Sequence, residues 1–194
     1  MRINGTFVTA GLLSVAATAA ITLGAAATPA ASPRIVLADN GVAIDTTNVA
    51  PGDGSLSNGQ TLTPFDVQNP AIGRLDPALL SAIQAAATAA SADGITMTIT
   101  SGWRSPEFQE RLLDSAVATY GSMAAARQYV QTPGGSKHVL GEAVDVGGVG
   151  ADQWLIANGA RFGLCQIYAN ELWHFELATD AAGNCPPLLP NASG

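Results

Sequence analysis

The order of predicted secondary structure is the feature that most restricts the fold of this chain. Asp76 before Pro77 and Ser105 before Pro106 each combine a helix-capping side chain with a proline suited to the first helical turn. Periodicity and turn signals predict helices over 76–93, 105–120, 123–130 and 152–158, and strands over 95–100, 142–146, 162–168 and 173–177. Because helices come mostly early and strands mostly late, we expect an α+β domain, with helices packed on one side of a small, largely antiparallel sheet.

Four segments are expected along the 194 residues. Residues 1–27 are typical of a secretion signal, with Arg2 ahead of an apolar run and an Ala-x-Ala cleavage pattern ending at Ala27; an uncleaved membrane anchor is the alternative. Residues 28–63 are rich in turn-forming residues without a sustained period, which indicates a linker or a loosely held arm. Residues 64–187 are then the predicted compact domain, and residues 188–194 a tail.

The charge of the chain excludes one class of partner. The formal net charge is −7, from 15 acidic and 8 basic residues. Nucleic-acid binding depends on clustered Lys and Arg side chains that displace counterions, and the basic residues here are scattered. The sequence therefore argues against a nucleic-acid-binding protein.

The chain has two cysteines, Cys165 and Cys185. Disulfides persist outside the cytoplasm, so an export signal favours a disulfide between them, which would clamp the segment around residues 171–174. Two reduced buried thiols are an alternative. A metal site is a weaker one, because neither cysteine has the close CxxC spacing of zinc–thiolate sites.

The only two histidines, His138 and His174, each lie near a carboxylate. If residues 142–146 form a strand, a turn at Gly141 folds His138 back toward the strand face that carries Asp145. An imidazole and a carboxylate would then converge. The alternative is a tight turn in which Asp145 only accepts hydrogen bonds from loop amides.

The second cluster contains Glu171 and His174. In a regular strand, residues three apart face opposite sides, so both side chains reach one site only if Glu171 lies in the preceding turn or at a bulge. Trp173 and Phe175 would then fill the core on the other face. The alternative is an amphipathic strand whose His and Glu are solvated.

The two clusters together resemble the zinc D-Ala-D-Ala carboxypeptidases of the VanY type. The shared pattern is Ser-x-His-x-x-Gly-x-Ala-x-Asp at residues 136–145, then Glu-x-Trp-His at 171–174, with Ser-Gly-Trp-Arg-Ser upstream at 101–105. The resemblance implies that one zinc is held by His138, Asp145 and His174, and that Glu171 is the catalytic base. It also implies the small α+β fold shared with lysostaphin-type endopeptidases and the hedgehog signalling domain.

The resemblance further implies that Arg104 contacts the substrate or the developing oxyanion, with Ser136 and Gln109 as weaker candidates for substrate binding. The structural alternatives are an ion pair between Arg104 and a surface carboxylate, a turn-capping Ser136 and a solvated Gln109. The chain has Leu172 where the family often has Pro, and Trp103 where it often has Tyr. The first difference loosens the approach to Glu171, and the second removes a hydroxyl.

The expected function is an exported zinc-dependent D,D-carboxypeptidase that removes the terminal D-Ala of peptidoglycan stem peptides. Alternatives are an endopeptidase or D,D-dipeptidase on the same scaffold, or a zinc-containing domain that binds cell wall without catalysis. We expect a monomer in the cell envelope or secreted, in contact with a membrane only if the N-terminal segment stays uncleaved. Five further polar residues are expected to be solvated or packing residues: Lys137, Glu142, Asp152, Tyr168 and Glu176.

Overall fold

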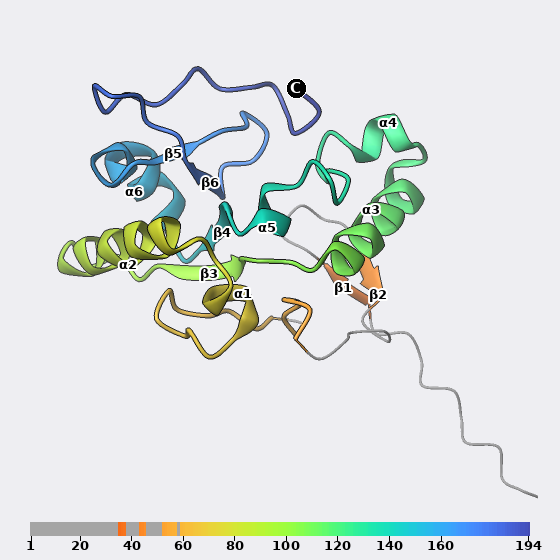
Figure 1. The fold of residues 1–194 in the computed structure, drawn as a ribbon, viewed down its shortest axis with the longest axis horizontal. Helices are drawn as coiled ribbons and strands as arrows, with labels where there is room; N and C mark the ends of the chain where they lie inside the picture. Colours follow the sequence, from red (N-terminus) through yellow and green to blue (C-terminus); the bar gives the residue numbers. More distant parts are fainter. Residues whose placement is uncertain (1–34, 38–42, 46–51, 58) are drawn as a thin grey trace, which may run out of the picture. The chain divides into compact units, whose positions relative to one another are not determined.

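The computed structural model describes residues 35–37, 43–45, 52–57 and 59–194 (Figure 1). All of them fall in the compact unit Ser32–Gly194. The signal or anchor predicted at residues 1–27 lies outside the described residues. Within the described residues, no helix combines the length and the apolar character needed to cross a bilayer.

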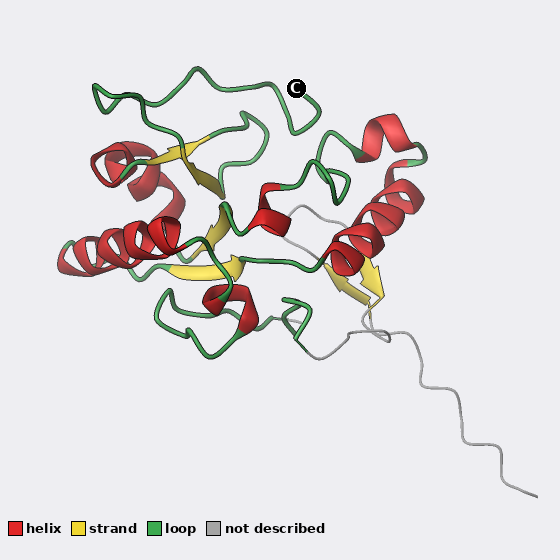
Figure 2. Cartoon of the chain, in the orientation of Figure 1, coloured by secondary structure: helices red, strands yellow, loops and turns green. Residues whose placement is uncertain are grey.

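The described helices and strands are interspersed along the chain (Figure 2). The helices are α1 (Pro70–Gly73), α2 (Pro77–Ala92), α3 (Pro106–Tyr120), α4 (Met123–Ala126), α5 (Lys137–Leu140), α6 (Ala151–Asn158) and the 3₁₀ helix η2 (Gly159–Phe162). The strands are β1 (Ile35–Leu37), β2 (Ala43–Asp45), β3 (Thr98–Ser101), β4 (Ala143–Gly147), β5 (Leu164–Gln166) and β6 (His174–Leu177). Strands β1 and β2 pair with each other in antiparallel fashion.

The two longest helices begin at the capping residues expected from the sequence. The Asp76 side chain accepts hydrogen bonds from the backbone N–H groups of Ala78 and Leu79 at the start of α2. The Ser105 side chain accepts from the N–H of Phe108 at the start of α3. Each cap satisfies amide groups that the helix itself leaves unpaired, which is why both starts were predictable.

The main sheet has four strands in the order β3-β4-β6-β5, and every neighbouring pair is antiparallel. This arrangement confirms the predicted α+β class with a small antiparallel sheet. It also places β4 and β6, which carry the candidate site residues, next to each other at the centre of the sheet.

The register of β4 against β6 separates the core face of the sheet from the site face. Val144 lies opposite Phe175 and Asp145 lies opposite His174. Val144 and Phe175 are fully buried in the main core together with residues of α2 and α6, such as Ile83 and Leu155. Because side chains alternate along a strand, Asp145 and His174 face away from that core.

A second apolar cluster joins α3 to α4 and the loop after it. Its buried members are Phe108, Leu112, Leu113, Ala116, Ala126 and Val130. The rings of Tyr120 and Tyr129 stack beside them with centroids 4.8 Å apart. This cluster holds the loop that follows α4, which forms part of the pocket described below.

Several predicted boundaries were wrong. The helix expected over 123–130 ends at Ala126, because the next residues turn to stack Tyr129 and bury Val130 in the second cluster. Strand β3 begins at Thr98 and β5 at Leu164, where the 3₁₀ helix Gly159–Phe162 replaces the expected start of the strand. Helices α1 and α5 were not predicted, since four residues are too few to show a helical period.

Packing onto the domain begins before residue 64. Leu62 exchanges two backbone hydrogen bonds with Ile99 of β3, at 2.9 and 2.7 Å. Asp53 is buried and its carboxylate lies 2.5 Å from the guanidinium of Arg111 on α3. Asp53 and Leu62 therefore contribute to the folded unit, while the division into signal, arm, domain and tail stays a prediction.

The structure contains the expected disulfide between Cys165 and Cys185. It ties the chain that follows β6 back to β5, across a sequence separation of 20 residues. In the chain-entropy account, a loop of this length stabilises a fold by about 3 kcal/mol.

Candidate metal centre and active-site pocket

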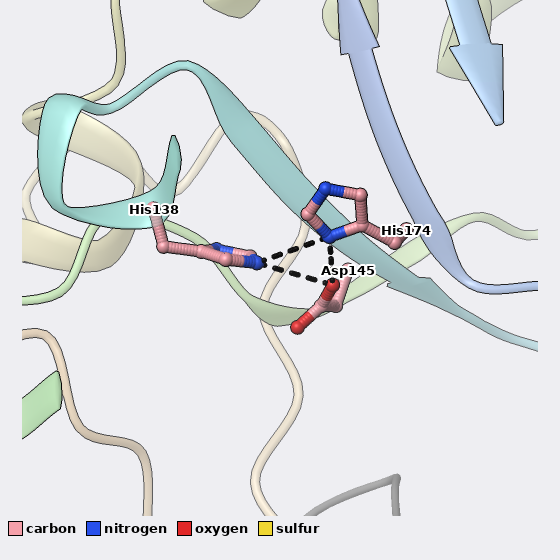
Figure 3. A group of neighbouring side chains, drawn as sticks. All are labelled: His138, Asp145 and His174. Atoms are coloured by element: carbon pink, nitrogen blue, oxygen red, sulfur yellow. Dashed lines mark hydrogen bonds and ion pairs between the residues drawn. The ribbon is translucent and has the colours of Figure 1, made fainter. Parts of the chain in front are cut away.

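His138, Asp145 and His174 meet on the site face of the sheet (Figure 3). His138 Nε2 lies 3.3 Å from His174 Nδ1 and 3.3 Å from Asp145 Oδ1. His174 Nδ1 lies 3.2 Å from the same Asp145 oxygen. The three atoms therefore form a nearly equilateral triangle, and all three residues are buried.

His138 is oriented by a backbone carbonyl. Its Nδ1 lies 2.8 Å from the oxygen of Gly102, so this nitrogen carries the proton and Nε2 presents a lone pair to the triangle. Gly102 itself packs tightly against the backbone of Ala71, because a Cβ at this position would meet the oxygen of Ala71 at 2.0 Å. The turn at Gly141, which has a φ of 75°, returns the chain from α5 into β4.

His174 is oriented by a carboxylate. Its Nε2 lies 2.9 Å from Glu176 Oε1, two residues along β6 on the same strand face. Since a carboxylate accepts the proton of that N–H, Nδ1 is the nitrogen left to face the triangle. The prediction that Glu176 is only solvated or a packing residue was therefore wrong: Glu176 is buried and bonded to a candidate ligand.

The donor set fits one divalent cation. Two bare imidazole nitrogens and a carboxylate oxygen held at 3.2–3.3 Å repel one another unless a positive charge lies between them. Zinc bonds to such atoms measure about 2.0–2.1 Å, so the edge of a zinc tetrahedron is about 3.3 Å, which the observed triangle matches. The set also leaves a fourth position for water, as in catalytic rather than structural zinc sites.

The charges around the triangle favour a cation. Burial alone would raise the pKa of Asp145, but His138, His174 and Arg104 together hold it well below its usual value. Burial lowers the pKa of His138, and the positive charge of Arg104 lowers it further, which keeps this ring neutral. A neutral imidazole beside an ionised carboxylate is the protonation state that metal binding requires.

Without a metal, His174 takes up the positive charge instead. Burial lowers its pKa, but hydrogen bonds to Asp145 and Glu176 outweigh that effect and raise the pKa to about 9. A cation at the triangle would compete with this proton, because both are stabilised by the same carboxylates.

Glu171 lies beside the triangle without belonging to it. Its Oε2 is 4.0 Å from His174 Nδ1, and within the described residues its Oε1 is buried with no hydrogen-bond partner. Burial raises the pKa of Glu171 to about 7. Of the two placements expected for Glu171, the turn before the strand or a bulge, the structure has the turn, because β6 starts at His174.

Arg104 holds the second oxygen of Asp145. Its Nη2 donates to Asp145 Oδ2 at 2.7 Å, its Nε donates to Ser101 Oγ at 2.8 Å, and its Nη1 donates to Gln109 Oε1 at 3.2 Å. The guanidinium therefore pairs with a buried site carboxylate rather than with the surface carboxylate considered as an alternative. Gln109 is fully buried, so the solvated alternative was wrong for this residue.

These side chains line one pocket of about 410 Å³, a volume that includes open solvent at its mouth. Ser136 is buried in its wall and makes no side-chain cap to α5, contrary to the turn-capping alternative. The pocket also includes residues not expected from the sequence: Tyr129, Val130, Gln131, Lys137, Tyr168, Trp173 and Ala192. Glu176, which is bonded to His174 but is not among these lining residues, was also missed; strand periodicity places it on the same face as His174 but does not show that bond.

The sequence model of the VanY family, described as D-alanyl-D-alanine carboxypeptidase, matches residues 73–178, more than half of the chain. The chain belongs to the VanY family. The match spans all three candidate ligands, Glu171 and Arg104, and it confirms the family resemblance drawn from the motifs.

Individual relatives agree with this VanY assignment. A D-alanyl-D-alanine carboxypeptidase of Enterococcus faecalis (strain ATCC 700802 / V583) is 32% identical over 127 residues, which cover 53% of this chain and 47% of that protein. This chain thus spans about half the length of this curated relative.

The chain also aligns with solved structures. The LD-carboxypeptidase LdcB aligns with a TM-score of 0.50 and 23% identity, over 56% of this chain and 61% of that one, which supports the fold alone. A VanY D,D-pentapeptidase from a VanB-type vancomycin resistance cassette, in complex with Zn(II), aligns with a TM-score of 0.47 and 26% identity over 75% of this chain and 78% of that one.

Proposed function

We propose that this VanY-family protein is an exported zinc-dependent D,D-carboxypeptidase that hydrolyses the terminal D-Ala-D-Ala bond of peptidoglycan stem peptides. The observation that carries the proposal is the buried triangle of two imidazole nitrogens and one carboxylate oxygen, spaced at 3.2–3.3 Å. Family membership supports the reaction class, and the disulfide between Cys165 and Cys185 supports a location outside the cytoplasm.

His138, Asp145 and His174 would hold the zinc, which when bound lowers the pKa of a coordinated water and polarises a carbonyl. Glu171 has the position and the environment of a general base. Its pKa of about 7 lies near a neutral working pH, where a carboxylate can both accept and return a proton.

Arg104 is the proposed positive group of the substrate site. Its guanidinium lines the pocket and is fixed by Ser101, Gln109 and Asp145, so it presents a preorganised charge. A terminal carboxylate or a developing oxyanion is the substrate group that such a charge would stabilise. Gln109 and Ser136, both buried in the pocket wall, would support that contact.

The test of this function joins metal analysis to a turnover assay. The purified protein should contain one zinc per chain and release D-Ala from a stem pentapeptide, and chelation should abolish release until zinc is restored. Cleavage of a cross-linked dimer or a free dipeptide, without cleavage of the pentapeptide, would instead identify an endopeptidase or a dipeptidase. Full zinc occupancy with no hydrolysis of any of the three would identify a binding domain.

Replacing the proposed base separates catalysis from metal binding. Glu171→Gln should keep zinc, because Glu171 is outside the ligand triangle, and should reduce kcat by at least about 10²-fold. Glu110→Gln, which changes an exposed glutamate on α3, is the matched control and should leave kcat unchanged. Loss of zinc from Glu171→Gln would show that Glu171 is a ligand and would remove it from the role of base.

A further inference from the structure

Residues 186–192, which we call the strap, are fastened to the protein on one side of the pocket. The disulfide holds Cys185 to Cys165 of β5, directly before the strap begins. Further along, Leu189 N donates to Ile167 O at 2.9 Å, and Ala169 N donates to Leu189 O at 2.8 Å. These bonds attach the strap to the loop between β5 and β6, which carries Tyr168 and Glu171.

The far end of the strap is attached to the opposite side of the pocket. Ala192 N donates to Gln128 O at 3.2 Å, and the Gln131 side chain donates from Nε2 to Ala192 O. Residues 186–190 are exposed, whereas Ala192 is 6% exposed and lines the pocket. Figure 1 shows this last part of the chain reaching the loop between α4 and α5.

A continuous series of hydrogen bonds joins the strap to the candidate metal centre. Gln131 binds Ala192 through its side chain and accepts, through its backbone oxygen, a 2.8 Å hydrogen bond from Gln109 Nε2. Gln109 in turn accepts from Arg104, which donates to Asp145. Every member lines the pocket, so the strap has a defined position relative to the three donor atoms.

We propose that the strap closes one end of the substrate pocket, with Ala192 as a specificity-determining residue that limits the site to the free end of a single peptide. The inference rests on the proposed function. Two observations carry it: hydrogen bonds fasten the strap to both sides of the pocket, and Ala192 near its far end is buried and lines the pocket. A peptide that continued past this end would have to displace the strap.

The first test fills the pocket at Ala192. Ala192→Leu in the zinc-loaded full chain should weaken binding of the D-Ala-D-Ala dipeptide and raise KM for the stem pentapeptide by about 10-fold, with kcat and zinc content less affected. The matched control is Ala181→Leu, which changes an exposed alanine between β6 and Cys185, outside the pocket, and should change neither quantity. Calorimetry with the dipeptide gives the binding constant without requiring turnover.

The second test releases the strap. The double variant Cys165→Ser with Cys185→Ser should increase cleavage of a cross-linked dimer relative to the pentapeptide by about 10-fold, because the closed end of the pocket opens. Thermal melting must show that this variant is folded at the assay temperature. An unchanged ratio in the folded variant, or unchanged dipeptide binding in Ala192→Leu, would overturn the proposal.

The two proposals fail in different ways. A wild-type protein that binds the dipeptide but hydrolyses no substrate contradicts the proposed function, while the binding comparison between Ala192→Leu and Ala181→Leu still decides the role of the strap. If the wild-type protein does not bind the dipeptide at all, the proposal that the strap forms a wall of the substrate pocket is wrong.

Discussion

At the residue scale, the site depends on which nitrogen of each histidine faces the triangle. Gly102 O accepts a hydrogen bond from His138 Nδ1–H, and the Glu176 carboxylate accepts one from His174 Nε2–H. The two rings therefore present different nitrogens to the triangle, Nε2 from His138 and Nδ1 from His174. Partners of this kind raise the basicity of a ligand and fix its orientation, so they affect metal affinity without touching the metal.

Glu176 is the partner whose contribution can be measured most directly. Glu176→Gln preserves size but removes the charge that faces His174, and zinc affinity should fall by about 10-fold to 100-fold. Competition with a chromophoric chelator measures this affinity without any substrate. The control is Glu142→Gln, which removes a half-exposed glutamate paired with Lys137 and should leave affinity unchanged. Equal affinities in wild type and Glu176→Gln would contradict the positioning role.

Several of the residues at the site could be selected from the sequence. His138, Asp145, His174 and Glu171 were selected from their types and motif spacing, and the structure brings all four side chains together. Their assignment as ligands and base stays a proposal. Glu176 was missed because a glutamate on a short strand has the same local pattern whether it is solvated or bonded to a buried histidine.

At the element scale, the turn from α5 into β4 sets the distance between His138 and Asp145. Gly141 ends α5 in the left-handed conformation, and a Cβ there would lie 2.6 Å from the backbone oxygen of Arg74. Asp76 N also donates to Gly141 O at 2.9 Å, so the turn is packed against the start of α2. The turn therefore has no space into which it could relax.

Gly141→Ala tests this rigidity. The variant should lower the free energy of unfolding by more than about 1 kcal/mol, from the unfavourable φ together with the clash, and should weaken zinc binding. Urea denaturation measures the first effect. Gly94→Ala is the control, because Gly94 has a φ of 80° but no atom lies within 4 Å of an added Cβ. This variant therefore measures the loss of unfolding free energy that comes from the positive φ alone. If both variants lose the same free energy and keep zinc, the packed turn does not set the site.

At the scale of the whole molecule, segments from outside the predicted domain pack onto it at two places. Asp53 joins α3 through Arg111, and its backbone oxygen accepts a 2.8 Å hydrogen bond from Ser105 N at the start of that helix. The strap joins the loops on the two sides of the pocket. Helix α3 carries Gln109, so both attachments reach elements that line the pocket.

Asp53→Ala should therefore destabilise the whole domain. Loss of the carboxylate leaves Arg111 and the Ser55 hydroxyl without their partner, at an expected cost of about 1–3 kcal/mol in the free energy of unfolding. Asp114→Ala, an exposed aspartate on α3, should cost less than about 0.5 kcal/mol. Equal urea midpoints for the two variants would show that the arm does not stabilise the domain.

The sequence by itself determined the α+β class, the starts of α2 and α3, the family and the identities of the candidate site residues. These features depend on local signals: a capping side chain before a proline, a strand period, and the spacing of a few polar residues. Only the tertiary structure decided which imidazole nitrogens face the triangle, that Arg104 pairs with Asp145, and that Ala192 lines the pocket. Those outcomes depend on the register of β4 against β6 and on contacts between residues far apart in the chain, which no local pattern encodes.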